Sequence, residues 1–285
     1  MIRARLVLLG AGAALVATLA LGPPARAALT VIPDSALTPS TTFFTDIIGG
    51  GIGDVVVTTG GGNAANVGNL SGRNDDGFRG PIPLGFTLHF FGTDYTTFFA
   101  NNNGNISFTG GLAQFTPNGP IGANVPVISP FFGDVDTRAP LSGVMHLRTD
   151  IPNEIIVTWD NVGYFNSHDD KLNSFQLVLR GPGFPIPVGE GAIGFFYKTM
   201  QWDTGDASGG QGGSGGSPAA VGFGDGAGNG EVLEGSTQAG IASIVNDHHI
   251  WFDPNLAPVP SVPEPTSLLF LGGALAGIVL WRMRK

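Results

Sequence analysis

Short apolar runs, separated by Gly, Pro and Asn, fill the chain from residue 84 to residue 254. Residues 86–91 and 95–99 flank Gly92-Thr93-Asp94, which predicts a hairpin with a short loop. Roughly a dozen short strands, with no long amphipathic helix among them, predict an all-β domain, an antiparallel sandwich or a barrel-like fold. The other strands are expected at residues 54–59, 105–109, 127–132, 143–148, 154–159, 174–179, 192–197, 219–223, 231–233 and 249–252.

Three segments interrupt or flank this pattern. Residues 28–83 are rich in Gly and Thr and form an N-terminal segment that is part of the β domain or appended to it. Residues 205–217 are almost entirely Gly, Ser and other small or polar residues, which predicts a flexible insertion between strands. Residues 255–262 form a Pro-rich spacer, expected to be extended. Pro130, inside one strand, suits the edge or the end of a strand because it has no backbone N–H.

An apolar stretch over residues 6–21 follows two arginines and precedes a Gly-Pro-Pro break. Ala25 and Ala27 are small residues at the positions that signal peptidase recognises, so we expect residues 1–27 to be a signal peptide, cut before Ala28. The alternative is an N-terminal helix that stays uncleaved as an anchor.

The C-terminal 24 residues, 262–285, begin with a Pro-Glu-Pro triplet and end with a basic cluster. Between them, residues 266–281 are apolar or small and predict a transmembrane helix of about 16 residues, near the short limit for a bilayer. The basic end would remain cytoplasmic under the positive-inside rule. An ordinary C-terminal anchor helix fits the same pattern. The residues that define this tail are Val262, Pro263, Glu264, Pro265, Arg282, Arg284 and Lys285.

The order of triplet, apolar helix and terminal cations resembles the PEP-CTERM sorting signal of Gram-negative bacteria. The resemblance implies that exosortase, a membrane protease, recognises the triplet and removes the tail, with the terminal cations as the stop signal. It also implies that the protein passes from an inner-membrane intermediate to the cell surface or the extracellular matrix. Exosortase and signal peptidase would then be its processing enzymes.

The charge balance changes once both ends are set aside. Six of the 13 basic residues lie in the terminal segments, so residues 28–265 hold 7 basic and 22 acidic residues, a formal charge of −15. Nucleic acids and anionic lipids bind through Lys and Arg, so neither is an expected partner of this body. Neutral glycans and cations are better candidates. The chain has no cysteine, which excludes disulfides, thiolate metal sites and a thiol nucleophile.

Ordered motifs across the β region resemble the extracellular NIDO domain of nidogen and related adhesive or matrix proteins. They are Phe90-Phe91-Gly92, residues 103–108, 128–138 and 173–179, Gln201-Trp202 and residues 220–223. Phe132-Gly133 departs from the Trp-Ala expected before the Asp-x-Asp of that family. The resemblance implies an extracellular interaction domain, over residues 84–254, and supplies no catalytic residues.

Asp134 and Asp136 are the strongest candidates for metal chemistry. On a strand, residues two apart face the same side, so both carboxylates could hold a calcium ion together with nearby oxygens. The alternative is a turn in which Asp134 caps backbone N–H groups and Asp136 pairs with Arg138. Asp75 and Asp76 are adjacent, so in an extended chain they would point to opposite sides. A shared ligand role for these two would need help from elsewhere.

Other polar groups are better explained structurally. Residues 166–171 predict a solvated loop, and one residue of His248-His249 is expected to pack inward because adjacent side chains on a strand diverge. Gly213-Ser214-Gly215 lies in the glycine-rich insertion, where a positioned nucleophile is not expected. Trp159, Trp202 and Trp251 could stack on a glycan but are typical of a β core.

These observations predict an exported, non-enzymatic surface or matrix protein that acts in adhesion, in biofilms, or in association with exopolysaccharide or surface proteins. Before processing, its C-terminal helix would hold it in the membrane. The alternatives are a secreted hydrolase of glycan or peptide, with Asp134 and Asp136 as working carboxylates, and a calcium-binding surface module.

Overall fold

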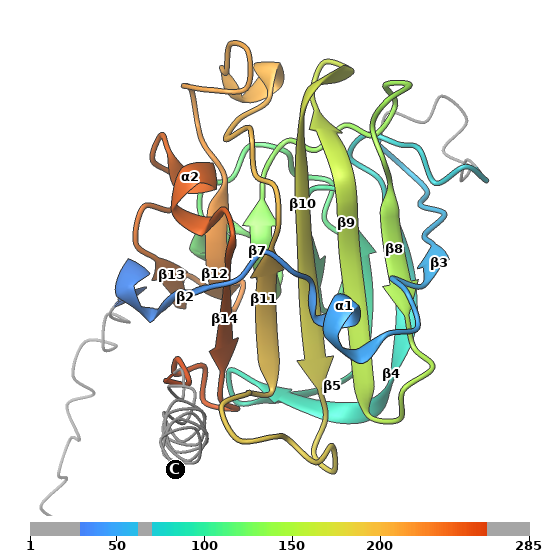
Figure 1. Cartoon of the computed structure of the whole chain (residues 1–285), viewed down its shortest axis with the longest axis vertical. Helices are drawn as coiled ribbons and strands as arrows, with labels where there is room; N and C mark the ends of the chain where they lie inside the picture. Colours follow the sequence, from blue (N-terminus) through green and yellow to red (C-terminus); the bar gives the residue numbers. More distant parts are fainter. Residues whose placement is uncertain (1–28, 62–69, 261–285) are drawn as a thin grey trace, which may run out of the picture.

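The computed structural model describes residues 29–61 and 70–260, which form two seven-stranded sheets packed face to face (Figure 1). Aromatic side chains from the two sheets meet between them: the Phe131 and Phe175 rings are 5.5 Å apart, as are Phe195 and Phe223. The predicted all-β class is therefore confirmed, and of the two architectures the fold is the sandwich.

The first sheet has the order β1-β13-β12-β7-β6-β5-β4. Its neighbours are antiparallel except for β1 and β13, which run parallel. The predicted hairpin is present, with β4 and β5 joined at Phe91-Gly92. The strands are β1 (Thr30–Ile32), β4 (Phe78–Phe90), β5 (Thr93–Asn101), β6 (Asn105–Ser107), β7 (Val127–Phe132), β12 (Ala220–Gly224) and β13 (Gly230–Leu233).

The second sheet has the order β2-β14-β11-β10-β9-β8-β3 and is antiparallel throughout. Its strands are β2 (Thr38–Pro39), β3 (Asp54–Val55), β8 (Met145–Arg148), β9 (Glu154–Tyr164), β10 (His168–Arg180), β11 (Ile193–Tyr197) and β14 (His248–Phe252). The helical turns described are η1 (Asp34–Ala36), α1 (Phe44–Ile48), η2 (Pro120–Gly122), η3 (Asp206–Ser208) and α2 (Ile241–Val245).

Both faces of the second sheet are buried. Along β10, Phe175, Leu177 and Leu179 join the core between the sheets, whereas Val178 joins a second apolar cluster on the outer face. The segment containing α1 crosses this outer face and adds Phe43 and Phe44 to that cluster (Figure 1). Because alternate residues of β10 face opposite sides, the apolar run from Phe175 to Leu179, interrupted only by Gln176, suits a strand covered on both faces.

The N-terminal segment supplies edge strands to both sheets. β1 pairs with β13 in the first sheet, and β2 and β3 pair with β14 and β8 in the second. The strand expected over residues 54–59 is thus only β3 in the structure. The remaining edge is β4, which contains Pro81 and Pro83 and two irregularities in its pairing with β5.

The missing N–H of Pro130 predicted a place at an edge or at the end of a strand. Pro130 instead lies inside β7, the middle strand of the first sheet. The pairing between β7 and β12 shifts register between Ser129 and Phe132. Pro130 lies within this irregular stretch, where a regular ladder hydrogen bond from its nitrogen is not required. The carbonyl of Pro130 accepts a hydrogen bond of 2.7 Å from the Tyr197 hydroxyl. A local bulge therefore accommodates the proline within a central strand.

The glycine-rich residues 205–217 lie between β11 and β12, as predicted for an insertion. The expected signal helix and C-terminal transmembrane helix lie outside the described residues. Among residues 29–61 and 70–260, no helix is long and apolar enough to cross a membrane.

Candidate functional site

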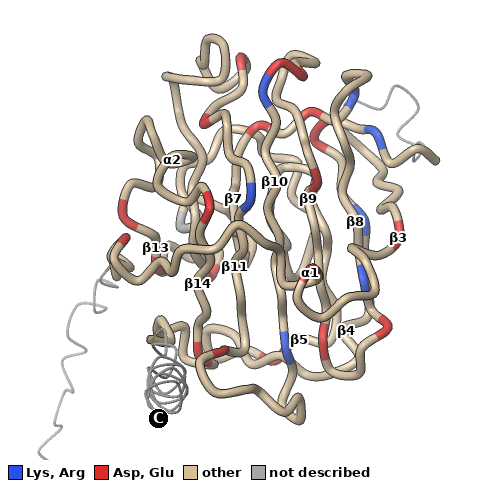
Figure 2. The backbone as a smooth tube through the Cα atoms, in the orientation of Figure 1, with Lys and Arg blue, Asp and Glu red and all other residues tan. Residues whose placement is uncertain are grey.

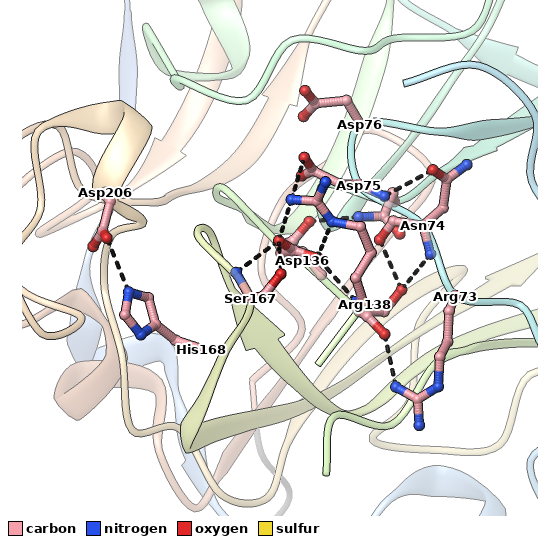
Figure 3. A network of polar contacts seen from close by, with 12 residues as sticks. Arg73, Asn74, Asp75, Asp76, Asp136, Arg138, Ser167, His168 and Asp206 are labelled. Atoms are coloured by element: carbon pink, nitrogen blue, oxygen red, sulfur yellow. Dashed lines mark hydrogen bonds and ion pairs between the residues drawn. The ribbon is translucent and has the colours of Figure 1, made fainter. Parts of the chain in front are cut away.

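The carboxylates singled out by the sequence lie just after β7. Residues 133–137 leave this strand and run between two other segments. Asp136 makes an isolated bridge to Asp75 on one side, and Val135 makes one to Tyr164, at the end of β9, on the other. This arrangement gathers acidic residues from separate parts of the chain around Arg138 (Figure 3).

Asp136 has a structural role in this arrangement. Its side chain is fully buried and accepts hydrogen bonds from Nε and Nη2 of Arg138, at 2.9 and 2.6 Å. It also accepts a bond of 2.8 Å from the backbone N–H of Ser167, in the turn between β9 and β10. The pairing of Asp136 with Arg138, expected in the alternative interpretation of this motif, is therefore present.

Asp134 turns instead toward Asp75 and Asp76. One carboxylate oxygen from each of the three residues lies within 4.8 Å of one from each of the others. Asp75 and Asp134 are only 4% and 1% exposed. Their Oδ1 atoms have no hydrogen-bond partner among the described residues. Oδ2 of Asp75 is 2.9 Å from Nη2 of Arg138, which links the three residues, hereafter the acidic cluster, to the Asp136 pair.

Asp134 and Asp136, expected together as ligands, thus have different neighbours in the structure. Arg138 lies two residues after Asp136 and folds back onto it, which leaves Asp134 to join the acidic cluster. Sequence reasoning set Asp75 and Asp76 aside because neighbours in an extended chain diverge. Asp76 has a φ of 58°, in the left-handed region, so the chain turns there and the alternation does not apply.

Asn103 holds the acidic cluster from one side. Nδ2 of Asn103 donates to Oδ1 of Asp76 at 2.8 Å, and its Oδ1 accepts from the backbone N–H of Val135 at 3.1 Å. Gly104 follows with a φ of 75°, and a Cβ there would lie 1.8 Å from the carbonyl oxygen of Phe131. Only glycine fits, so this tight turn fixes Asn103 against the end of β7.

The glycine-rich insertion closes the other side. A Cβ on Gly205 would lie 2.5 Å from Oδ2 of Asp134, so the absence of a side chain lets the backbone approach the carboxylate. Ser208 is buried, and its Oγ is 3.5 Å from the same oxygen. The insertion therefore contributes a hydroxyl to the acidic cluster.

Burial and mutual repulsion make these acids reluctant to ionise. Burial raises the pKa of Asp134 to about 8, with further increases from the charges of Asp76, Asp75 and Asp136. Burial also raises the pKa of Asp75 to about 7, and that of Asp76 above its ordinary value. Such a set of oxygen ligands either holds protons at neutral pH or binds a hard cation.

The remaining candidates from the sequence have structural explanations. Nε2 of His168 is 2.9 Å from Oδ2 of Asp206, in a partly exposed pair away from the acidic cluster (Figure 3). His249 stacks on the Phe196 ring, so one histidine of the pair packs against the sheet as predicted. Ser214 is exposed in a turn with Gln211. The core assignment is confirmed for all three tryptophans: Trp159, Trp202 and Trp251 are 0%, 1% and 4% exposed.

The processing residues predicted at both ends lie outside the described residues. These are Ala25, Ala27 and Ala28 at the signal cleavage site, and Val262, Pro263, Glu264, Pro265, Arg282, Arg284 and Lys285 in the sorting tail.

Comparison with known families supports both resemblances. Residues 56–257 match the model of the NIDO-related domain, which is more than half of the chain. The chain belongs to the NIDO-related family. Residues 261–285 match the PEP-CTERM protein-sorting motif. This motif is the exosortase recognition signal, so the NIDO-related domain is part of an extracellular protein sorted by exosortase in a Gram-negative bacterium.

The NIDO-related domain is similar to segments of much longer proteins. Alpha-tectorin of Gallus gallus is 33% identical over 177 residues, and alpha-tectorin of Homo sapiens 31% over 178; each match covers 52% of this chain and 8% of the tectorin. Nidogen of Drosophila melanogaster is 26% identical over 117 residues, 32% of this chain and 9% of the nidogen. The chain thus spans less than a tenth of these relatives. No solved structure matches.

Proposed function

We propose that this protein is a non-enzymatic component of the cell surface or extracellular matrix that acts in adhesion or in association with exopolysaccharide. The observation that carries the proposal is the joining, in one chain, of a NIDO-related domain at residues 56–257 to an exosortase sorting motif at residues 261–285. The motif determines where the domain is delivered, and the domain is what the protein presents there.

The burial of the candidate carboxylates supports a non-enzymatic role. A glycosidase or acid protease needs two carboxyl groups that flank the bond to be cleaved and are open to a polymeric substrate. Asp134 and Asp136 are 1% and 0% exposed, and both oxygens of Asp136 are occupied by Arg138. A glycan or peptide chain could not reach them without local unfolding.

Surface charge favours partners that are neutral or cationic. Acidic side chains are distributed over the described body, and Lys and Arg are few (Figure 2). Since Trp159, Trp202 and Trp251 are buried, polar contacts rather than stacking on these rings would hold a glycan. This composition suits a matrix component that binds hydrated neutral polymer.

The test uses the producing strain with its own gene deleted and restored. We expect the restored chain to return to the exopolysaccharide fraction and to restore cell adhesion. A chain with Pro263→Ala and Glu264→Ala should be made in equal amount but stay with the membranes. Asp94→Asn, an exposed change outside the sorting motif, is the matched control. Full adhesion without the gene would refute the proposal.

A hydrolysis screen addresses the enzymatic alternative. The purified chain is incubated with the strain's exopolysaccharide and with peptide substrates, and we expect no release of reducing ends or amines above the background of heat-treated protein. Turnover that Asp136→Ala abolishes would overturn the non-enzymatic assignment.

A further inference from the structure

The acidic cluster has the dimensions of a calcium shell. Calcium binds oxygen ligands at about 2.3–2.6 Å, so two oxygens on one ion lie at most about 5 Å apart. In the structure, one oxygen each from Asp75, Asp76 and Asp134 lies within 4.8 Å of the others. The ligands come from two segments, one before β4 and one after β7, so an ion between them would join distant parts of the chain.

Two of these carboxylates carry an oxygen with nothing to bind. Oδ1 of Asp75 and Oδ1 of Asp134 are buried and have no hydrogen-bond partner in the described part of the chain. Their side chains are 4% and 1% exposed, so bulk water does not compensate. Leaving buried carboxylate oxygens unpaired is costly, and a bound cation removes that cost for both residues.

A second cation would also balance the local charge. Asp75, Asp76 and Asp134 lie together, and Arg138 joins Asp75 to Asp136. Arg138 is committed to Asp75 and Asp136, at 2.9 and 2.6 Å. When all four acids are ionised, a single guanidinium leaves three negative charges uncompensated, and a divalent cation would leave one.

Neutral oxygens adjoin the carboxylates. Oγ of Ser208 is 3.5 Å from Oδ2 of Asp134, and Oγ1 of Thr116 is 3.0 Å from that hydroxyl. The carbonyl oxygen of Gln114 accepts from the same Asn103 amide that contacts Asp76. A set made only of oxygens, mixing carboxylate, hydroxyl and carbonyl groups, selects a hard cation that tolerates irregular geometry.

We propose that Asp75, Asp76 and Asp134 bind one calcium ion, which fastens the turn before β4 and the glycine-rich insertion to the end of β7. The ion has a structural role and supplies no reaction step. The site differs from the Asp134–Asp136 pair suggested by the sequence, because Asp136 serves as the partner of Arg138. It does not depend on whether the domain binds polysaccharide.

Calcium titration of the full-length chain tests the site. The chain is purified in mild detergent, freed of calcium with chelator and titrated with calcium chloride in a calorimeter. We expect one ion per chain, with a Kd of about 10⁻⁴ to 10⁻³ M as in extracellular modules. Calcium at about ten times the Kd should raise the Tm by several degrees. Asp75→Asn and Asp134→Asn should each weaken binding at least tenfold.

Two controls separate loss of the site from loss of the fold. Asp94→Asn removes an exposed charge near His89 and should leave calcium affinity unchanged. Asp203→Asn alters a buried aspartate that accepts the N–H groups of Gly240 and Ala242, and should lower the Tm while keeping calcium binding. Without calcium at pH 8, Asp134→Asn should melt no lower than the unchanged chain, because it removes one of the repelling charges.

Either of two results would overturn the proposal. One is the absence of both binding heat and Tm change with calcium at about 10 mM, well above the expected Kd. The other is calcium binding that Asp75→Asn and Asp134→Asn leave unchanged while both variants stay folded.

Discussion

Two arginines in this domain, one buried and one partly exposed, compensate buried carboxylates in different ways. Arg180, on the outer face of the second sheet, is 2% exposed and contacts Glu154 at 2.7 Å and Glu190 at 2.6 Å. Its guanidinium also lies 4.4 Å from the centroids of Phe184 and Trp251. Arg138, just after β7, pairs with Asp75 and Asp136, lies 5.7 Å from the centroid of the Phe165 ring, and its side chain is 34% exposed.

The difference is one of charge balance. Around Arg180, two carboxylates face one cation and aromatic rings complete its surroundings, although Oε1 of Glu154 also lacks a hydrogen-bond partner among the described residues. Around Arg138 there are four aspartates for one cation, and Oδ1 of Asp75 and Oδ1 of Asp134 have no hydrogen-bond partner among the described residues. The first arrangement is typical of a structural ion pair and the second of a site that takes a ligand.

Replacing Arg180 should have the largest effect. Arg180→Met keeps much of the packing against Trp251 but leaves Glu154 buried without its partner. We expect a loss of about 3–5 kcal/mol in the free energy of unfolding, measured by urea denaturation. Adding Glu154→Gln should restore a large part of it. A loss below about 1 kcal/mol would mean that the ion pair of Arg180 with Glu154 contributes less to stability than its burial and geometry indicate.

The acidic cluster should make calcium-free stability fall with rising pH. The pKa values of Asp75 and Asp134, about 7 and about 8 in the folded chain, lie above those of unfolded aspartate. The folded state then binds more protons between about pH 4 and pH 8, so raising the pH through this range favours unfolding. Asp76 and Asp136 reinforce the shift, and Arg138 opposes it.

We expect the calcium-free chain to lose roughly 2–4 kcal/mol of unfolding free energy between pH 5 and pH 8 relative to a variant carrying Asp75→Asn and Asp134→Asn. This comparison isolates the acidic cluster from other titrating groups such as His249, whose pKa is lowered by burial. Excess calcium should remove most of the difference. If the unfolding free energies of the two chains change equally with pH, the acidic cluster does not carry the excess negative charge assigned to it.

Replacing Arg138 should cost less than replacing Arg180. Arg138→Gln removes the ion pairs with Asp75 and Asp136 but acts on a side chain that water already reaches. We expect a loss of about 1–3 kcal/mol, larger at pH 8 than at pH 5, because the guanidinium compensates ionised acids. Thermal melts at the two pH values measure it. A loss that is the same at both would show that Arg138 acts mainly by packing.

Ser208→Ala should have the smallest effect. The hydroxyl contacts Asp134 at 3.5 Å, so its removal should lower calcium affinity a few-fold and stability by about 0.5–1 kcal/mol. Calorimetric titration measures the affinity, with Ser214→Ala as the matched control in the same insertion. An identical change in both variants would assign the effect to the loop and not to the hydroxyl.

The strands could be predicted because their apolar patterns are local. The hairpin around Gly92 follows from its apolar runs and turn residues. β10 was anticipated only over residues 174–179, because its first half, from His168, is polar and was predicted to be a loop. The place of a strand in its sheet is not local, which is why Pro130 was expected at an edge and lies in the middle. The edge strand β1 forms by pairing with β13, which lies about two hundred residues later in the chain. A local sequence pattern cannot reveal such a distant partner.

The site was likewise predictable only where its residues are close together in the sequence. The Asp-x-Asp motif identified Asp134, and the alternative interpretation anticipated the pair of Asp136 with Arg138. The contribution of Asp75 and Asp76 depends on the left-handed turn at Asp76 and on the bridge between Asp75 and Asp136. The consecutive acids of the Asn-Asp-Asp-Gly turn were the available signal, but spacing alone does not show which segment they face.

The short strands at the margins of the sandwich determine how neighbouring copies can meet. β1, β2 and β3 offer only three, two and two residues, and β4 interrupts its outer row of donors with Pro81 and Pro83. Such margins are poor templates for an added strand from another molecule. With such margins the domain resists cross-β stacking, and contacts between copies are left to side chains.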